Sequence, residues 1–166
     1  MIHAQYNESQ KFTQVWLWVI LMSVSLVTIL PTAKSLFDQE PVSTTSVFTF
    51  LAILLFLIAL NALFYFAKLE TKIDKDEVSI VFRPFINKPK VFRWEDIKEA
   101  HVRKYNSLTE FGGWGIRYGW NGKAYNTSGN QGLQLVLKSG KKVLIGTQKA
   151  SDVEAFLKKY IFTDSI

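Results

Sequence analysis

The sequence predicts a membrane α-helical hairpin followed by a mainly-β domain that ends in a C-terminal helix. Three observations support this fold class. Charge is almost absent from residues 12–67 of the 166-residue chain and dense from residue 68 onward. At about residue 69 the hydrophobic pattern changes from continuous to alternating, which is typical of half-buried strands. Near the C-terminus an amphipathic stripe restores a helical period.

Two apolar runs are long enough to cross a bilayer. Residues 13–30 make about 27 Å of helix and residues 47–67 about 31 Å, against a hydrocarbon core of about 30 Å. Neither run has a polar face, which argues against a buried core helix. A cleaved signal peptide also fits the first run poorly, because segment 1–12 is not strongly basic and a second run follows soon after.

The distribution of lysine and arginine predicts the orientation of this hairpin. The connecting segment 31–46 carries one lysine and two acids, whereas residues 68–166 hold 18 of the 20 Lys and Arg and 11 of the 14 acids. A juxtamembrane basic cluster is expected directly after the second run, at Lys68, Lys72 and Lys75. The positive-inside rule then places both termini, with segment 1–12, in the cytoplasm and segment 31–46 outside. We expect a multi-pass protein of the cell inner (cytoplasmic) membrane.

Alternating apolar residues mark the strands of the second part. Val78, Ile80 and Phe82 share one face, and Leu133, Leu135 and Leu137 share another. The polar segment 74–77 predicts one turn, and Ser139-Gly140 predicts a two-residue turn into the next strand. About six or seven antiparallel strands are expected in total, arranged as a small barrel or sandwich that one helix closes.

The last element has the period of a helix. Ser151 and Glu154 have the spacing of a capping box, which predicts Ser151 as the N-cap. An apolar stripe follows at i, i+3, i+4 and i+7, formed by Val153, Phe156, Leu157 and Tyr160.

Together these pieces resemble the bacterial PH-like (pleckstrin-homology-like) membrane proteins, which carry an N-terminal pair of transmembrane helices. The matching segments are FRWEDI (92–97), GGWGIRY (112–118), YNTSGNQGLQLVLKSGKKVLIGT (125–147) and QKASDVEAFLKK (148–159). The resemblance implies that residues 68–166 form a PH-like domain of two antiparallel sheets, about seven strands, capped by a C-terminal α-helix. It brings no catalytic residues with it.

The residue types leave little room for catalysis. The chain has no cysteine and two histidines, which excludes disulfides, thiol nucleophiles and cysteine-based zinc sites. His101 lies in no metal-binding motif, and the adjacent Glu95 and Asp96 are expected to start a turn rather than to act together. Segment 112–115 lacks the lysine and the helix of a P-loop. We therefore predict a protein that is not an enzyme and has no cofactor and no metal site.

A cluster of aromatic and basic residues is the main candidate for binding. Its candidate contact residues are Arg103, Lys104, Trp114, Arg117, Tyr118, Trp120 and Lys123. Such a mixture can bind single-stranded nucleic acid, but half of the aromatic residues in this region are needed for a core, so no nucleic-acid partner is predicted. Three interpretations remain: anionic headgroups of the bilayer, an acidic protein segment, or an ordinary solvated basic surface that binds nothing. The resemblance implies that an inositol-phosphate site would use a basic hairpin between the first two strands, but the corresponding turn at 74–77 is acidic on balance, although Lys88 and Lys90 with Arg83 and Arg93 could form a basic edge at the next turn. Because two spans already tether the domain, weak lipid affinity would add little, which favours a protein partner, for example one that adds a strand to a sheet edge.

The predicted function is therefore non-catalytic. A cytoplasmic PH-like domain would bind a membrane or cytoplasmic protein, or lipid headgroups, and so scaffold or regulate other membrane components. The alternative is an accessory subunit of a membrane enzyme or transporter. In that case the second apolar run would pack against partner helices through Asn61 and the small residues Ala52, Ala59 and Ala62.

Overall fold

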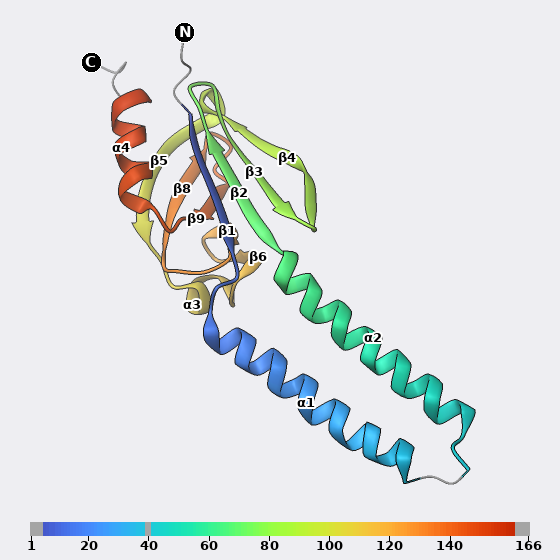
Figure 1. Ribbon diagram of the computed structural model, residues 1–166. Coiled ribbons are helices and arrows are strands. Elements are labelled where there is room, and N and C mark those ends of the chain that lie inside the picture. Colours follow the sequence, from blue (N-terminus) through green and yellow to red (C-terminus); the bar gives the residue numbers. More distant parts are fainter. Residues whose placement is uncertain (1–4, 39–40, 162–166) are drawn as a thin grey trace. The chain divides into compact units, whose positions relative to one another are not determined.

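The computed structural model describes residues 5–38 and 41–161, and its elements are drawn in Figure 1. These residues form two compact units. One is helical and consists of residues 13–66. The other joins the described part of segment 1–12 to the residues from 67 onward, and it contains all the strands. The structure therefore has the predicted fold class of a helical hairpin and a β domain.

The helical unit consists of α1 (Val15–Phe37) and α2 (Thr44–Phe66), each of 23 residues. Each helix is about 35 Å long, which together with its apolar composition is enough to span a membrane. Both extend beyond the predicted runs, so the connection is 38–43 rather than 31–46. The prediction ended the first run at Leu30 and assigned Pro31 to the connecting segment, but that proline lies inside α1. A proline removes one backbone donor, and here it does not stop the helix.

A polar contact joins the two helices. The Asn61 side-chain amide donates to Ser25 Oγ at 3.2 Å and to the Leu57 carbonyl at 2.9 Å. Leu21 and Leu57 are buried in the same unit, while most other large apolar side chains of both helices are exposed. Asn61 therefore contributes to packing inside the hairpin.

The β unit contains two sheets. The first has the order β1-β2-β3-β4, with β1 (Tyr6–Lys11), β2 (Lys68–Ile73), β3 (Glu77–Arg83) and β4 (Ile86–Arg93). The second has the order β5-β8-β9-β7-β6, with β5 (Ile97–Lys104), β6 (Gly115–Gly119), β7 (Gly122–Asn126), β8 (Gln131–Leu137) and β9 (Lys142–Gly146). Short helices η1 (Trp94–Asp96) and α3 (Ser107–Phe111) lie between strands.

Three details of the β unit differ from the sequence prediction. Among the described residues, eight strands form from residue 68 onward instead of about seven, and β1 adds a ninth. Strand β7 pairs with β9 in parallel, so the second sheet is mixed rather than antiparallel. The β8–β9 connection spans 138–141 instead of two residues. The predicted turn at 74–77 is present, where Asp74 Oδ1 accepts from the amides of Asp76 and Glu77.

The N-terminal segment is the largest difference. It was expected to lie outside the domain, yet β1 pairs antiparallel with β2 in a register that sets Tyr6 opposite Ile73 and Lys11 opposite Lys68. Its inward side chains, Glu8 and Gln10, are buried and polar. Because alternating polar residues look like a solvated segment, the sequence pattern conceals this strand.

The core lies between the sheets and under the last helix. Its buried apolar side chains come from both sheets as the alternation predicted: Leu69, Ile73, Val78, Ile80, Phe82, Leu133, Leu135, Val143 and Ile145. Helix α4 (Ala150–Tyr160) contacts β5 and β8 and buries Val153 and Leu157.

The predicted capping box is wrong. Lys149 is the N-cap of α4, no side chain caps it, and Ser151 already lies inside the helix. The segment before the helix is held instead from the other end of the chain, because Glu8 accepts the Gln148 amide at 2.8 Å and the Thr147 hydroxyl at 2.6 Å.

Candidate functional site: a basic groove beside an exposed tryptophan

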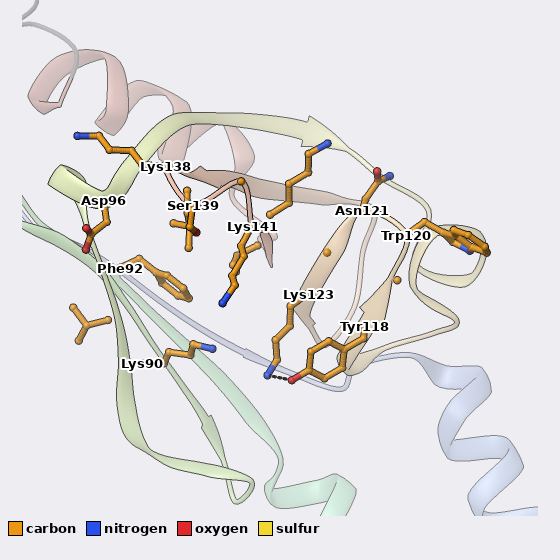
Figure 2. Close-up of a pocket in the computed structure, with 17 residues that line it drawn as sticks. Lys90, Phe92, Asp96, Tyr118, Trp120, Asn121, Lys123, Lys138, Ser139 and Lys141 are labelled. Carbon is orange, nitrogen blue, oxygen red and sulfur yellow. Dashed lines mark hydrogen bonds between the residues drawn. The ribbon is translucent and has the colours of Figure 1, made fainter.

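A groove of about 860 Å³ opens between the two sheets of the β unit (Figure 2). Strand β4 forms one wall with residues 90–92, and the β6–β7 hairpin forms the other with residues 118–123. The β8–β9 connection and Asp96 of η1 complete it at one end. A cavity of this size accommodates a small ligand or several side chains of a partner.

The groove is strongly basic. Its lining contains five lysines, Lys90, Lys123, Lys138, Lys141 and Lys142, and one acid, Asp96. In Figure 2 the side chains of Lys90, Lys123 and Lys141 extend toward the interior of the groove from three different elements. Since like charges that share a cavity repel each other, an anionic occupant would be favoured there.

Tyrosine side chains position two of these lysines. The Lys90 ammonium donates to the Tyr125 hydroxyl at 3.0 Å and so links β4 of the first sheet to β7 of the second. Lys123 donates to the Tyr118 hydroxyl at 2.6 Å and lies 5.1 Å from the centroid of the Tyr125 ring. The same hydrogen bond lowers the pKa of Tyr118. Partial burial opposes the charge on Lys123, but its bonds to both tyrosines raise the pKa of this amine overall, so it stays protonated.

The β6–β7 hairpin presents Trp120 to solvent. Trp120 is 99% exposed and Tyr118 is 76% exposed, although both are large aromatic residues. The hairpin is packed closely against its neighbours, because a Cβ on Gly119 would lie 2.0 Å from the Glu110 carbonyl oxygen and one on Gly122 would lie 2.2 Å from that of Lys142. Tryptophan, with tyrosine and arginine, is one of the residue types enriched among those that dominate protein–protein binding energy.

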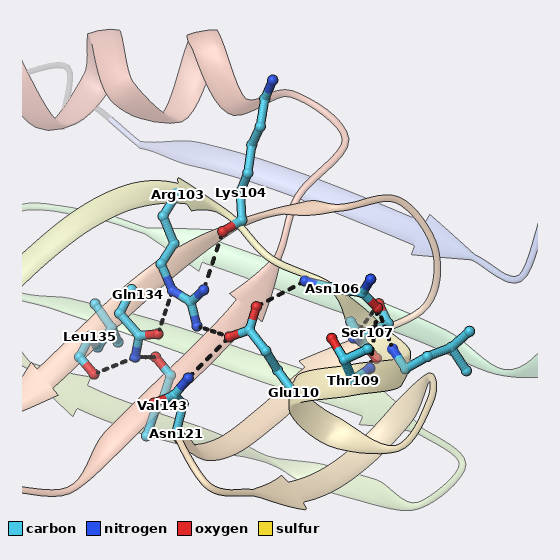
Figure 3. Close-up of polar contacts among 12 residues, drawn as sticks. Arg103, Lys104, Asn106, Ser107, Thr109, Glu110, Asn121, Gln134, Leu135 and Val143 are labelled. Atoms are coloured by element: carbon cyan, nitrogen blue, oxygen red, sulfur yellow. Dashed lines mark hydrogen bonds and ion pairs between the residues drawn. The ribbon is translucent and has the colours of Figure 1, made fainter.

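A hydrogen-bond network centred on Glu110 holds this hairpin (Figure 3). Its carboxylate accepts from Arg103 Nη2 at 2.8 Å, from Asn121 Nδ2 at 3.1 Å and from the Asn106 amide at 2.9 Å. Asn106 in turn caps α3 by accepting from the amides of Leu108 and Thr109. The network thus ties strand β5, helix α3 and the turn next to Trp120 to one carboxylate.

The same network predicts a pH dependence of stability. The hydrogen bond from Arg103, opposed by partial burial and aided by the Asn106 and Asn121 donors, lowers the pKa of Glu110 from 4.5 to about 2. A lowered folded-state pKa stabilises the fold above the unfolded value and loses that effect as the pH falls toward 2. We expect about 1–2 kcal/mol after allowance for solvent screening, because the side chain is 23% exposed.

A comparison with Glu110→Gln isolates this contribution from other acids. The difference in free energy of unfolding between the parent protein and the variant should be largest above pH 5 and should shrink between pH 4.5 and 2. Denaturant titrations at several pH values measure it. A difference that is constant over this range would show that the Glu110 charge does not contribute.

The structure places some of the candidate residues from the sequence analysis at the groove and others away from it. Tyr118, Trp120 and Lys123 lie together on the groove. Arg103 donates hydrogen bonds to Glu110 and to Gln134 Oε1. Lys104 is exposed but does not line the groove. Arg117 donates to the Trp114 carbonyl at 2.8 Å, and neither residue lines the groove.

Other aromatic residues of the same region form part of the core. Tyr105, Phe111 and Tyr125 are buried, in agreement with the expectation that half of the cluster serves packing. The sequence analysis did not identify Lys138, Lys141 and Lys142 as site residues, because they come from a segment outside the aromatic cluster. The three lysines of segment 138–142 (Lys-Ser-Gly-Lys-Lys) are the feature of the sequence that could have identified this part of the groove.

The expected juxtamembrane cluster is also rearranged. Strand β2 starts at Lys68, and five steps of roughly 3.3 Å carry the chain about 17 Å away by Ile73. Lys72, which pairs with Asp74 at 3.3 Å, and Lys75 are therefore near the far end of the strand. Lys68 has other basic neighbours, since the register sets it opposite Lys11 on one side and Arg83 on the other.

The structure also locates the polar residues that the sequence analysis considered for catalysis. His101 Nδ1 lies 2.9 Å from Glu99 on the exposed face of β5, and Glu95 and Asp96 form the short helix η1. Within residues 5–38 and 41–161, no three His, Cys, Asp or Glu side chains come together in a way that could hold a metal ion. No protein-family model matches the chain, and a search of curated proteins finds no similar sequence.

Proposed function

We propose that this protein is a membrane-anchored, non-catalytic binding module. Its helical hairpin crosses the cell inner membrane twice, and its β unit is a cytoplasmic PH-like domain. The basic groove binds an acidic segment of another protein, and Trp120 packs against an apolar residue of that segment. The observation that carries this proposal is a fully exposed tryptophan held on a rigid hairpin beside five lysines.

The pairing of β1 with β2 supports two crossings. Strand β1 precedes α1 and strand β2 follows α2, so the two strands can pair only if the hairpin leaves and returns on the same side. If the chain crossed the bilayer only once, β1 and β2 would lie on opposite sides of it and could not pair. The excess of lysine and arginine in the same part of the chain favours the cytoplasmic side.

The position of the groove favours a protein over a lipid headgroup. Its β8–β9 end is joined to η1 by the bond from the Lys138 amide to the Asp96 carbonyl. Trp94 of η1 donates to the Asp74 carbonyl, at the end of β2 opposite Lys68. Part of the groove therefore lies at the end of the first sheet opposite Lys68, the residue at which β2 starts after α2. A protein segment can reach this end without leaving the cytoplasm.

In-cell crosslinking from a photoreactive residue at position 120 tests the proposal. We expect a discrete protein adduct that is lost in Lys123→Glu/Lys141→Glu, because the groove then repels an acidic segment. The matched control is Lys98→Glu/Lys104→Glu, which makes the same charge change on exposed residues of β5 outside the groove and should keep the adduct. Adducts with lipid alone, or a protein adduct lost equally in both variants, would overturn the proposal.

A further inference from the structure

We propose a second binding surface, at the end of the first sheet where the helices join, which docks onto the anionic headgroup layer of the bilayer. It consists of a row of three cations, Lys11, Lys68 and Arg83, and of Phe85 in the β3–β4 turn. The inference rests on the membrane-spanning hairpin of the proposed function but is independent of the groove. Its ligand is a lipid surface rather than a protein.

The cations come from three adjacent strands. Lys11 of β1 is opposite Lys68 of β2, which is opposite Arg83 of β3. Neighbouring strands lie about 4.8 Å apart, so the three backbone positions span about 10 Å across the sheet. Glu70 forms ion pairs with Lys68 at 2.5 Å and with Arg83 at 3.4 Å. The row with Glu70 keeps a net charge of +2, from three cations and one anion.

Chain connectivity places this row at the surface of the bilayer. Helix α1 starts at Val15, four residues after Lys11, and α2 ends at Phe66, two residues before Lys68. At no more than about 3.5 Å per residue, neither lysine can lie further than about 14 Å from the end of its helix. Where an apolar helix leaves the hydrocarbon core, the adjacent residues enter the headgroup layer. Basic residues there gain from anionic lipid.

An exposed aromatic residue completes the surface. Phe85 is 57% exposed in the turn that follows Arg83. Its ring packs edge-on against the buried Phe82 with centroids 6.0 Å apart, and Phe82 stacks on Phe12 at 6.4 Å. Phe12 directly precedes the helical unit in sequence. Aromatic side chains are favoured at the level of the lipid headgroups, which accounts for the exposure of Phe85.

The opposite end of the sheet carries no such excess of positive charge. Asp74, Lys75 and Asp76 of the β2–β3 turn and Glu77 at the start of β3 sum to −2, but Lys72 pairs with Asp74 and Arg93 lies opposite Glu77. A sheet that is basic only at the end joined to the helices is oriented by an anionic leaflet.

Fluorescence quenching in lipid nanodiscs tests the docking on the full chain. Because the sequence has no cysteine, single variants Phe85→Cys, Lys75→Cys and Leu55→Cys can each carry one environment-sensitive fluorophore. Nanodiscs contain phosphatidylglycerol or only phosphatidylcholine, with spin labels at the headgroup or deep in the acyl chains. We expect headgroup-level quenching at position 85 in the anionic discs, none at position 75, and deep quenching at position 55 in α2.

Charge variants test the lipid specificity. Lys68→Gln/Arg83→Gln should lower the ratio of docked to undocked protein about 30-fold, because each basic residue near an anionic leaflet contributes about 1 kcal/mol. The matched control Lys72→Gln/Lys75→Gln removes the same charge at the far end of β2 and should leave quenching at position 85 unchanged.

Three results separate the possible failures. If position 85 is as unquenched as position 75 while position 55 is quenched, the docking surface is refuted and the spanning hairpin stands. If quenching at position 85 is equal in both lipid compositions, the requirement for anionic lipid is refuted. If position 55 is not quenched by deep spin labels, the hairpin does not span and the proposed function fails together with this inference.

Discussion

Gly122→Ala is expected to destabilise the β unit by about 3 kcal/mol or more, and to abolish crosslinking from position 120. The backbone at Gly122 has φ +99, where a residue with a side chain is strained. The added Cβ would also lie 2.2 Å from the Lys142 carbonyl oxygen, and neither of these backbone segments can yield without breaking the β7–β9 pairing. Urea unfolding of the purified protein measures the loss.

Gly140→Ala is the matched control. Gly140 has φ +80, but a Cβ there meets no atom within 4 Å. Only the conformational strain remains, and we expect a loss of about 1 kcal/mol. If the two variants lose equal stability, the close approach of β7 to β9 does not limit this hairpin. If Gly122→Ala is stable but its crosslinking disappears, the tight packing serves the position of Trp120 rather than the stability of the fold.

The sequence predicted what periodicity and composition encode locally. The two apolar helices were identified by their length and lack of charge. The alternation of Val78, Ile80 and Phe82 and the apolar stripe of α4 have a period that identifies the element and its buried face. These features depend on neighbouring residues alone, so no knowledge of the tertiary arrangement was needed to find them.

Features that depend on distant segments escaped prediction. The N-cap of α4 is Lys149 rather than Ser151, and the residues before it, Thr147 and Gln148, bond to Glu8, which precedes them by well over a hundred residues. The groove was found only in part, since its aromatic hairpin is one segment but Lys90 comes from the other sheet. Pairing partners and cross-sheet contacts are set by topology, which hydrophobic periodicity does not specify.

Glu8→Leu is expected to cost about 2–4 kcal/mol and to release β1, because the substitution leaves buried donors without an acceptor. Glu8 Oε2 accepts from Thr147 and from the Tyr6 hydroxyl at 2.8 Å, and Oε1 accepts the Gln148 amide. Both Glu8 and Thr147 are buried. Hydrogen–deuterium exchange measures the local effect: amides in residues 6–11 and 68–73 should exchange faster, while those in β8 and β9 should change little.

Two variants test whether β1 is released by the loss of the hydrogen-bond acceptor at Glu8 or by the loss of its charge. Glu8→Gln keeps one carbonyl oxygen and should lose about half as much stability as Glu8→Leu. Glu95→Leu removes a carboxylate that is 70% exposed and should stay within about 0.5 kcal/mol of the parent. Unchanged exchange in Glu8→Leu would mean that the backbone pairing with β2 suffices, and that the buried carboxylate serves only the start of α4.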